Sequence, residues 1–494
     1  MSKRRSGVLM HISSLPSPFG IGVFGTETKE FIDTVADMGF SCWQVLPFHP
    51  VNPQNSPYES ESAFAGNYLF IDPRILAEDG LIGKSDVNEC IYSGSPYTAD
   101  YAFAKETRLS ALKKAYKNLS PQTKAEIDSF ADKHKWLESY ALYKALKTKN
   151  GEAPWWTWGK YADYNEATDT DEIDEVNFWK FVQYEFFRQW DKIKRYANEK
   201  GVHILGDMPI YVSMDSADVW SNRGLFLIND DYSASEIAGV PPDYFSEDGQ
   251  LWGNPIYDWE RMEKDDFNWW KSRISEELSI YDDLRIDHFR GFASYWSVDA
   301  KSDTAKNGVW KNGPGMKLFN AVKDVIGEHG IIAEDLGTFG NDVVKLLEDT
   351  GFPGIRVIQF GFEPDSDSTH LPHNYPQNCV AYLGTHDNNT LLGWLWEASE
   401  NERKFALEYC GFEGDNWGEG GFKAPACRKI IETVWRSSAD TVIIAFQDLC
   451  GFGSDARLNT PGVADGNWLF RTTSETIACA DKEYYKKINR LFRR

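Results

Sequence analysis

The chain has 494 residues, of which 42% are hydrophobic and 26% are charged, a composition typical of a folded globular protein. Its 52 Lys and Arg residues against 75 Asp and Glu residues give a net charge of -23, which makes nucleic acid and anionic membrane surfaces poor partners. No apolar stretch approaches the ~18 residues of a transmembrane helix, so we expect neither a membrane span nor a signal peptide.

Eight short apolar runs rich in β-branched residues predict β-strands, and each run ends in a polar or glycine-containing cluster. In chain order they are 7–15, 41–47, 203–212, 283–289, 331–337, 354–362, 380–388 and 441–451. Segments with helical spacing lie between them, at 27–38, 178–199, 316–328, 341–349 and 428–436. In the first helix, Thr26 is the expected N-cap and Gly39 the expected stop. Alternating strands and helices predict a parallel sheet, and eight such units predict a (β/α)8 barrel, or TIM barrel.

The chain is longer than a bare barrel requires, and the excess length follows three of the predicted strands. The predicted insertions are 50–202 after the second strand, 213–281 after the third and 390–440 after the seventh. No internal repeat or low-complexity linker marks a separately folding module. We therefore expect a single catalytic barrel over residues 1–494, with the insertions as subdomains around its active-site face and no separate C-terminal β domain.

The seven cysteines are an odd number, lie far apart and form no C-x-x-C pair, which predicts a reducing cytoplasm and no cysteine metal site. The aromatic content is 15%, and several aromatic residues fall in polar, Gly- and Pro-rich stretches. They are Trp155, Trp156, Trp158, Tyr244, Phe245 and Trp252. Aromatic faces in a cleft suit sugars, whose C–H faces are apolar and whose rims are polar. Burial of these rings under the insertions is the alternative interpretation.

Acidic side chains follow four of the predicted strands, at the ends that form the catalytic face of such a barrel. They are Asp207, Asp287, Glu334 with Asp335, and Asp387, and Arg285 and His386 lie beside them in the sequence. Any one of these residues alone is best explained by a salt bridge or a helix cap. Several carboxylates on one rim repel one another unless they bind a cation or differ in protonation, so the whole set predicts a functional site.

Two kinds of chemistry fit acids that gather on a barrel rim. Cleavage of a glycosidic bond needs one ionised carboxylate as nucleophile and one protonated carboxyl as acid, about 5 to 5.5 Å apart in a retaining enzyme. Arg285 precedes Asp287 by two residues on a strand and so faces the same side, where its charge would favour an ionised nucleophile. The alternative is a divalent metal site with Asp287, His386 and Asp387 as ligands, although no H-x-H or H-E-x-x-H pattern occurs.

A set of longer motifs gives the chain a resemblance to a known family. The motifs are GVLMHISSLPSPFGIG (7–22), SPYESESAFAGN (56–67), GDMPIYV (206–212), PPDYFSEDGQLWGNPIYDW (241–259), RIDHFRGF (285–292), GVWKNGPG (308–315), AEDLG (333–337), LPHNYPQN (371–378), GTHDNNT (384–390) and GSDARLNTPG (453–462). With them the chain closely resembles the 4-α-glucanotransferases, also called amylomaltases or disproportionating enzymes, which are relatives of α-amylase. The resemblance covers residue 7 to about residue 471, nearly the whole chain.

The resemblance implies an activity and a role for individual residues. The activity is the transfer of α-1,4-glucan segments between maltooligosaccharides or to glucose, by a retaining double displacement through a covalent glycosyl-enzyme and without metal or organic cofactor. Asp287 matches the family's nucleophile, Glu334 its general acid/base, and Asp387 the carboxylate that holds sugar hydroxyls. The implied substrate-binding residues are Arg285, His386, Asp207, Tyr58, Tyr244, Phe245, Trp252 and Asn459.

Three other functions stay open from the sequence. The first is a hydrolase with weak transfer, the second is a metal-dependent barrel hydrolase, and the third is a glucan-binding protein without catalysis. No obligate protein partner is expected for a 4-α-glucanotransferase of this kind.

Overall fold

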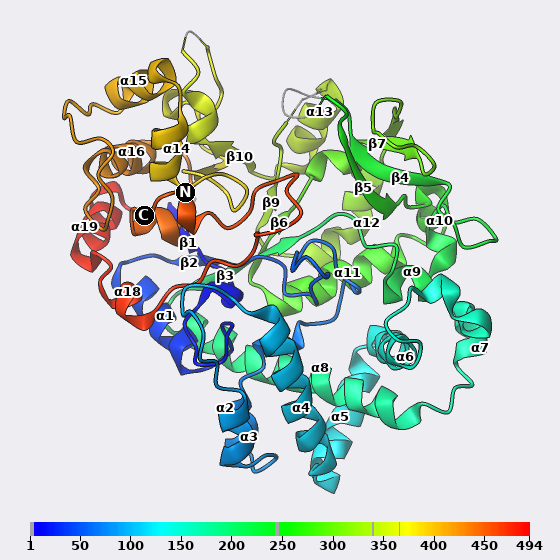
Figure 1. The fold of residues 1–494 in the computed structure, drawn as a ribbon. Coiled ribbons are helices and arrows are strands. Elements are labelled where there is room, and N and C mark those ends of the chain that lie inside the picture. Colours follow the sequence, from blue (N-terminus) through cyan, green and yellow to red (C-terminus); the bar gives the residue numbers. More distant parts are fainter. Residues whose placement is uncertain (1–3, 243–246, 338–339, 365) are drawn as a thin grey trace.

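The computed structural model describes residues 4–242, 247–337, 340–364 and 366–494, and its centre is a closed barrel of eight parallel strands (Figure 1). The strands, in their order around the barrel, are β1 (Arg5–Leu9), β2 (Cys42–Gln44), β3 (His203–Met208), β6 (Asp283–Ile286), β9 (Ile331–Ala333), β10 (Gly354–Val357), β11 (Cys379–Tyr382) and β12 (Thr441–Ala445). Pairing of β1 with β12 closes the ring. Each predicted apolar run overlaps one of these strands, and β1 and β11 begin before their runs, so the predicted (β/α)8 barrel is confirmed.

Helices connect successive barrel strands on the outside of the ring. They are α1 (Thr26–Asp37), α8 (Ile173–Glu199), α11 (Asn268–Ile280), α12 (Met316–Ile326), α13 (Asn341–Thr350) and α16 (Pro425–Arg436), and α19 (Lys482–Phe492) follows the last strand. In the described part of the segment between β10 and β11, the helical turns are the 3-10 helices η7 (Ile358–Gly361) and η8 (Pro372–Asn374). All five helices predicted from spacing are present, and α8 begins five residues before its predicted start.

The N-cap predicted for the first helix is wrong by one position. The cap residue is Gly25, and Thr26 is the first residue inside α1. A Cβ atom on Gly25 would lie 2.1 Å from Asp72 Oδ2, so a residue with a side chain does not fit at the cap. Because this contact comes from a residue distant in the sequence, the local N-cap preference for Thr could not reveal it.

The long segments after β2, β3 and β11 carry additional elements around the barrel (Figure 1). After β2 these are α2 (Pro73–Glu78), α3 (Lys84–Glu89), α4 (Tyr101–Lys117), α5 (Pro121–Lys133), α6 (Trp136–Lys149) and α7 (Tyr164–Ala167). After β3 they are α9 (Ala217–Ser221), β4 (Glu236–Val240), β5 (Gln250–Pro255) and α10 (Trp259–Lys264). After β11 they are α14 (Leu391–Glu397) and α15 (Glu400–Tyr409), and α17 (Phe446–Leu449) and α18 (Ser474–Ala478) follow β12.

A small antiparallel sheet lies beside the barrel and was not predicted as a unit (Figure 1). Its strand order is β5-β4-β7-β8, where β7 (Ser294–Asp299) and β8 (Val309–Asn312) follow the fourth barrel strand. The sheet therefore joins chain from the segment after β3 to chain from the segment after β6. This pairing positions β5, and with it Trp252, at the rim of the barrel.

Two buried clusters hold the barrel together. Alternate residues of a strand point to opposite faces, so Val8 packs outward against the helices while Leu9 packs inside the ring. The interior cluster contains Leu9, Cys42, Leu46, Leu205, Ile332, Ile355, Val357, Val380, Tyr382, Ile443, Leu458 and Trp468. Each fully buried large aliphatic side chain contributes about 1.5 to 3 kcal/mol to stability, so the ring has a packed centre and functional side chains are left for its ends. Within the described residues, none of the helices has the length and apolarity needed to cross a membrane.

Candidate active site

A cleft of ≈ 450 Å³ opens at the carboxyl ends of the barrel strands. The predicted site residues that line it are Tyr58, Trp252, Asp287, His386, Asp387 and Asn459. Arg285 and Asp207 lie at its base, where both are buried. Residues far apart in the sequence thus meet at one end of the barrel, and Tyr244 and Phe245 lie outside the described residues.

Asp207, Arg285 and Asp287 form an ion-paired chain that runs from the base of the cleft to one of its walls, which Asp287 lines. Asp207 on β3 and Arg285 on β6 are direct register partners. Arg285 Nη1 donates to Asp207 Oδ1 at 2.6 Å and Oδ2 at 2.7 Å, and Nη2 lies 2.9 Å from Asp287 Oδ1. Burial lowers the pKa of Arg285, but the charges of Asp207 and Asp287 outweigh it and raise this pKa well above its usual range, so the positive charge beside Asp287 is permanent.

The protonation of Asp207 is set by two opposing effects. Burial raises the pKa of its carboxyl to about 6, although the charge of Arg285 acts in the opposite direction. Asp207 is 0% exposed and Arg285 3%, so this pair is removed from solvent. A buried pair of this kind tolerates loss of one partner poorly, because the remaining charge is left uncompensated.

Glu334 is held by backbone amides. Its Oε2 accepts a hydrogen bond from the His288 N–H at 2.8 Å, and its Oε1 accepts one from the Leu336 N–H at 2.7 Å. Burial, followed by the charge of Asp287, raises the pKa of Glu334 to about 7, while Arg285 and the two amides act in the opposite direction. A carboxyl with this pKa carries its proton in a large fraction of molecules at neutral pH, as a general acid requires.

The strand register places Asp287 and Glu334 side by side. Ile286 on β6 pairs with Ala333 on β9, and the two carboxyl-bearing residues directly follow this pair. Neighbouring strands of a sheet lie about 4.8 Å apart. The backbone therefore places Asp287, which is paired with the cationic Arg285, next to Glu334, whose pKa is raised.

Asp387 forms the opposite wall of the cleft, and its carboxyl and main chain are held by side chains from two loops. Asn459 Nδ2 donates to Asp387 Oδ1 at 2.6 Å, and His386 Nε2 lies 3.3 Å from the same oxygen. Arg457 donates through Nη2 to the Asp387 carbonyl at 2.7 Å and through Nε to the Asn459 carbonyl at 2.8 Å. Arg457 thereby ties the loop that carries Asp387 to the loop that carries Asn459. Sequence reasoning missed Arg457, although it lies in the same motif as Asn459.

Tyr58 connects the two walls. Its hydroxyl donates to Asp207 Oδ2 at 2.9 Å and lies 3.4 Å from His386 Nδ1. Its ring stacks on the His386 ring with a centroid distance of 5.0 Å and an interplanar angle of 18°. Trp468, which was not predicted, lies 5.8 Å from the Tyr58 ring and 5.9 Å from the His386 ring, so the three rings form one aromatic group at the cleft.

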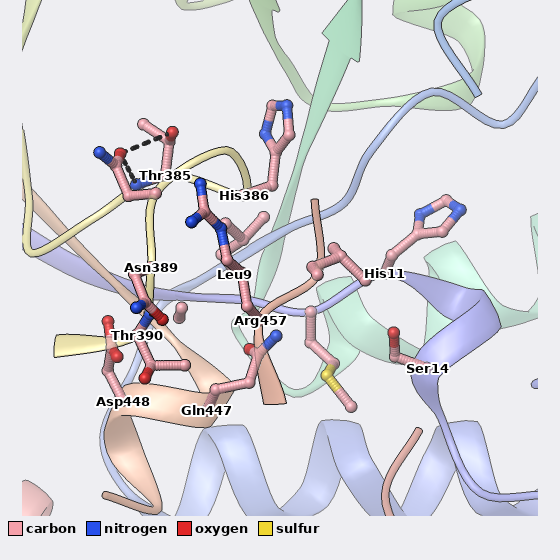
Figure 2. A pocket seen from close by; sticks show the side chains of 14 residues that line it. Leu9, His11, Ser14, Thr385, His386, Asn389, Thr390, Gln447, Asp448 and Arg457 are labelled. Carbon is pink, nitrogen blue, oxygen red and sulfur yellow. Dashed lines mark hydrogen bonds between the residues drawn. The ribbon is translucent and has the colours of Figure 1, made fainter. Parts of the chain in front are cut away.

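Behind His386 lies a much smaller cavity of ≈ 20 Å³, which Figure 2 shows with the side chains that surround it. Burial, followed by the charge of His386, lowers the pKa of His11 to about 3. The Leu46 N–H donates to His11 Nδ1 at 3.2 Å, so this nitrogen is the unprotonated one of a neutral ring. Burial raises the pKa of Asp448, on the other side of this cavity, to about 7.

The aromatic residues of the polar stretches divide between the two interpretations. Trp155 and Trp158 are 0% and 4% exposed, and their rings pack against Tyr232 and Trp220 of the segment after β3, so burial explains them. Trp156 is 37% exposed. Trp252 on β5 lines the cleft, and its indole lies 4.8 Å from the His288 ring in an edge-to-face contact.

The residues proposed as alternative metal ligands are engaged in other contacts. Asp287 is paired with Arg285, and Asp387 accepts a hydrogen bond from Asn459. Over the described part of the chain, three or more His, Cys, Asp or Glu side chains are nowhere grouped so that they could hold a metal ion. The geometry of the cleft instead fits a reaction that uses one charged and one protonated carboxyl.

Comparisons with known proteins give matches over nearly the whole chain. A family model described as 4-alpha-glucanotransferase matches residues 10–476. A 4-alpha-glucanotransferase of Clostridium butyricum is 45% identical over 98% of this chain and 99% of its own, and a chloroplastic/amyloplastic one of Solanum tuberosum is 39% identical over 96% and 83%. The solved structure of an amylomaltase from Streptococcus agalactiae in complex with acarbose superposes with a TM-score of 0.95, at 37% identity and with full coverage of both chains. The similarity thus extends over the barrel and over the segments between its strands.

Proposed function

The chain belongs to the 4-alpha-glucanotransferase family and is a retaining glucan-transferring enzyme, and we propose that Asp287, Glu334 and Asp387 carry out its reaction. Asp287 is the nucleophile, Glu334 the general acid/base, and Asp387 the carboxylate that holds the hydroxyls of the reacting sugar. The observation that carries this assignment is the contrast between two adjacent carboxyls, one ion-paired with Arg285 and the other with its pKa raised to about 7.

In the first half of the reaction, the Asp287 carboxylate attacks the anomeric carbon of the donor glucan. The bond from this carbon to the glycosidic oxygen breaks, and the Glu334 carboxyl donates its proton to the departing oxygen. The products are a glycosyl ester on Asp287, a shortened glucan with a free 4-hydroxyl, and an ionised Glu334. Arg285 supports this step because it orients the attacking oxygen.

The second half reverses these roles. The Glu334 carboxylate takes the proton of an acceptor 4-hydroxyl, whose oxygen attacks the anomeric carbon and releases Asp287. The ester has no charge, so the like-charge repulsion that raised the pKa of Glu334 is absent while the intermediate exists. The pKa of Glu334 therefore falls when it must act as a base and rises again when Asp287 is regenerated. The structure of the pair thus supports both directions of proton transfer.

Transfer, as opposed to hydrolysis, needs an acceptor that is bound and oriented better than water. Tyr58, Trp252 and Trp468 present aromatic surfaces along the cleft, to which the C–H faces of glucose units can stack. An acceptor held in this way gains the large rate advantage of an oriented reactant. These surfaces support a transferase in which the acceptor occupies the same cleft as the donor.

Several finer properties belong to the same proposal. Maltooligosaccharides serve as donor and acceptor and glucose as an acceptor, with no nucleic acid, membrane or obligate protein partner. Residues 1–494 act as one catalytic barrel, with 50–202, 213–281 and 390–440 as subdomains around the site. The net charge of -23 supports a neutral substrate over a polyanion, and the free cysteines support a reducing cytoplasm.

Incubation with maltotriose alone tests the transfer. We expect a ladder of longer oligosaccharides together with glucose, because each glycosyl-enzyme is taken up by another oligosaccharide. If glucose and maltose are the sole products, the protein is a hydrolase and the proposal is wrong. A parallel digest after exhaustive chelation should give the same ladder, and loss of activity on chelation would favour the metal-dependent alternative.

A further inference from the structure

His288, which directly follows Asp287, has an unusual backbone conformation. Its φ of 50° and ψ of 47° place it in the left-handed region, which residues with a Cβ atom adopt uncommonly. In an extended strand, successive N–H groups point in opposite directions, whereas in a left-handed turn they point to the same side. The conformation of His288 therefore makes its own N–H and that of Phe289 converge.

Both converging amides bind Glu334. The His288 N–H donates to Glu334 Oε2 at 2.8 Å, and the Phe289 N–H donates to the Glu334 carbonyl at 3.1 Å. The Glu334 N–H in turn donates to the Ile286 carbonyl at 3.0 Å. The turn at the end of β6 thus binds both the main chain and the carboxyl of Glu334. Both bonds depend on the backbone conformation of His288, which sets the directions of the two N–H groups.

We propose that His288 is a positioning residue whose left-handed backbone, and not its imidazole, holds the carboxyl of Glu334 for the transfer reaction. The inference rests on the proposed role of Glu334 as acid and base. An amide that donates to a carboxylate favours the ionised form, which is the form that must accept a proton in the second half of the reaction. If this amide hydrogen bond is lost, burial and the charge of Asp287 raise the pKa of Glu334 further.

Several other charged groups near Glu334 also affect its pKa. Asp287 raises this pKa and Arg285, on the same strand end, lowers it. Arg290, in the turn that follows β6, also interacts with the Glu334 charge. The neighbouring Asp335 is paired with Arg356 at 3.0 Å. Burial lowers the pKa of His288 to about 3, so its ring is neutral and exerts no charge on Glu334 at working pH.

The test compares variants that differ in their tolerance of the left-handed region. His288→Gly and His288→Val both lose the imidazole and its contact with Trp252, but Gly adopts this conformation freely and a β-branched residue does not. The readout is the basic limb of the pH profile of kcat/KM, which reports the proton on Glu334 in the free enzyme.

We expect His288→Gly to keep the basic limb of the unmodified enzyme, and His288→Asn, whose side chain also tolerates the left-handed region, to do the same. In His288→Val the limb should move upward by about one pH unit, the effect of one lost amide hydrogen bond to a carboxylate. Identical limbs in the Gly and Val variants overturn the proposal. If His288→Val does not fold, His288→Ala takes its place, with a smaller shift in the same direction.

A Glu334→Gln variant separates this inference from the proposed function. If Glu334→Gln transfers glucan with an unchanged basic limb, Glu334 is not the acid, and the proposed function fails together with the inference. If Glu334→Gln is inactive while the Gly and Val variants share one limb, the proposed function stands and the role of His288 alone is wrong.

Discussion

The two walls of the cleft hold their carboxylates by different means. Asp287 and Glu334 are fixed by residues at the ends of barrel strands, through an ion pair with Arg285 and through main-chain amides. Asp387 is fixed from loops, by the side chain of Asn459 and by Arg457. The Asp387 side chain is 43% exposed against 28% for Asp287.

This difference follows the work that each wall does in the proposed reaction. Bond making and proton transfer need carboxyls whose positions and charges are set in advance, and hydrogen-bonded strands with a buried guanidinium provide this. Holding the hydroxyls of a sugar needs a group that the substrate can reach, and an exposed carboxylate on a loop provides that. Changes to the strand-borne wall should therefore affect chemistry and stability, and changes to the loop-borne wall should affect mainly the use of substrate.

The largest expected effect is loss of the nucleophile. Asp287→Asn should lower the rate of transfer from maltotriose by about 10⁴-fold or more, because an amide does not form the glycosyl ester. Affinity for a longer maltooligosaccharide, measured by calorimetry, should be largely retained. Asp303→Asn, at an exposed aspartate, is the matched control. An Asp287→Asn enzyme with full activity would show that Asp287 is not the nucleophile and that its wall of the cleft does not carry the chemistry.

The second largest effect is expected from removal of the positive charge of Arg285. Arg285→Met leaves the buried Asp207 and its neighbour Asp287 without a positively charged partner, so we expect a loss of about 3 to 5 kcal/mol in the free energy of unfolding. Denaturant titration measures this loss. Arg285→Lys keeps the charge but cannot contact both carboxylates with the same geometry, so it should lie between the unmodified protein and the Met variant. A Met variant as stable as the unmodified protein would show that the pair does not hold the strand ends.

The pH dependence sharpens the contrast between Asp287 and Glu334. Glu334 must be protonated to act as the acid, and its pKa is about 7, so kcat/KM should fall about tenfold per pH unit above neutrality. Because this pKa is raised relative to the unfolded chain, the native state holds the extra proton, and the Glu334 contribution to stability decreases as pH rises from about 4.5 to about 7. Asp287→Asn removes the repelling charge, so a direct NMR titration of Glu334 in this variant should give a lower pKa. An unchanged pKa would mean that the two carboxyls do not interact.

The smallest effect is expected on the loop-borne wall. Asn459→Ala removes one hydrogen bond to the half-exposed Asp387, so we expect kcat/KM to fall by about tenfold, mainly through KM, with little change in unfolding free energy. Asn459→Asp places a second carboxylate against the first and should lower kcat/KM further. A loss of stability as large as that of Arg285→Met would contradict the division between the two walls.

Much of the fold was predictable because its signals are local. The apolar runs gave all eight barrel strands, and helical spacing gave five of the helices between them. The strand pair β7 and β8 was not predicted, since its partner strand β4 lies on another segment and two short strands alone carry little pattern. The N-cap at Gly25 was missed for a similar reason, as the contact that requires a glycine comes from Asp72.

Six of the residues that line the cleft were predicted from the sequence, whereas Arg457, Trp468 and most of the contacts within the site were not. That acids gather at the strand ends follows from the barrel and from motifs that can be read in the sequence. The bond from Tyr58 to Asp207 joins residues 149 positions apart, and that from Asn459 to Asp387 joins residues 72 positions apart. No pattern of spacing or composition reports such pairs.

The sequence by itself therefore determined the barrel, its family and the side chains available at the rim, because periodicity, strand ends and motifs are properties of neighbouring residues. The tertiary structure alone decided how burial and main-chain amides act on the pKa of Glu334, and how far solvent reaches Asp287 and Asp387. It also decided the left-handed turn at His288 that directs two amides to Glu334. Charge and hydrogen bonding depend on distance in space, and that distance is set only when the chain has folded.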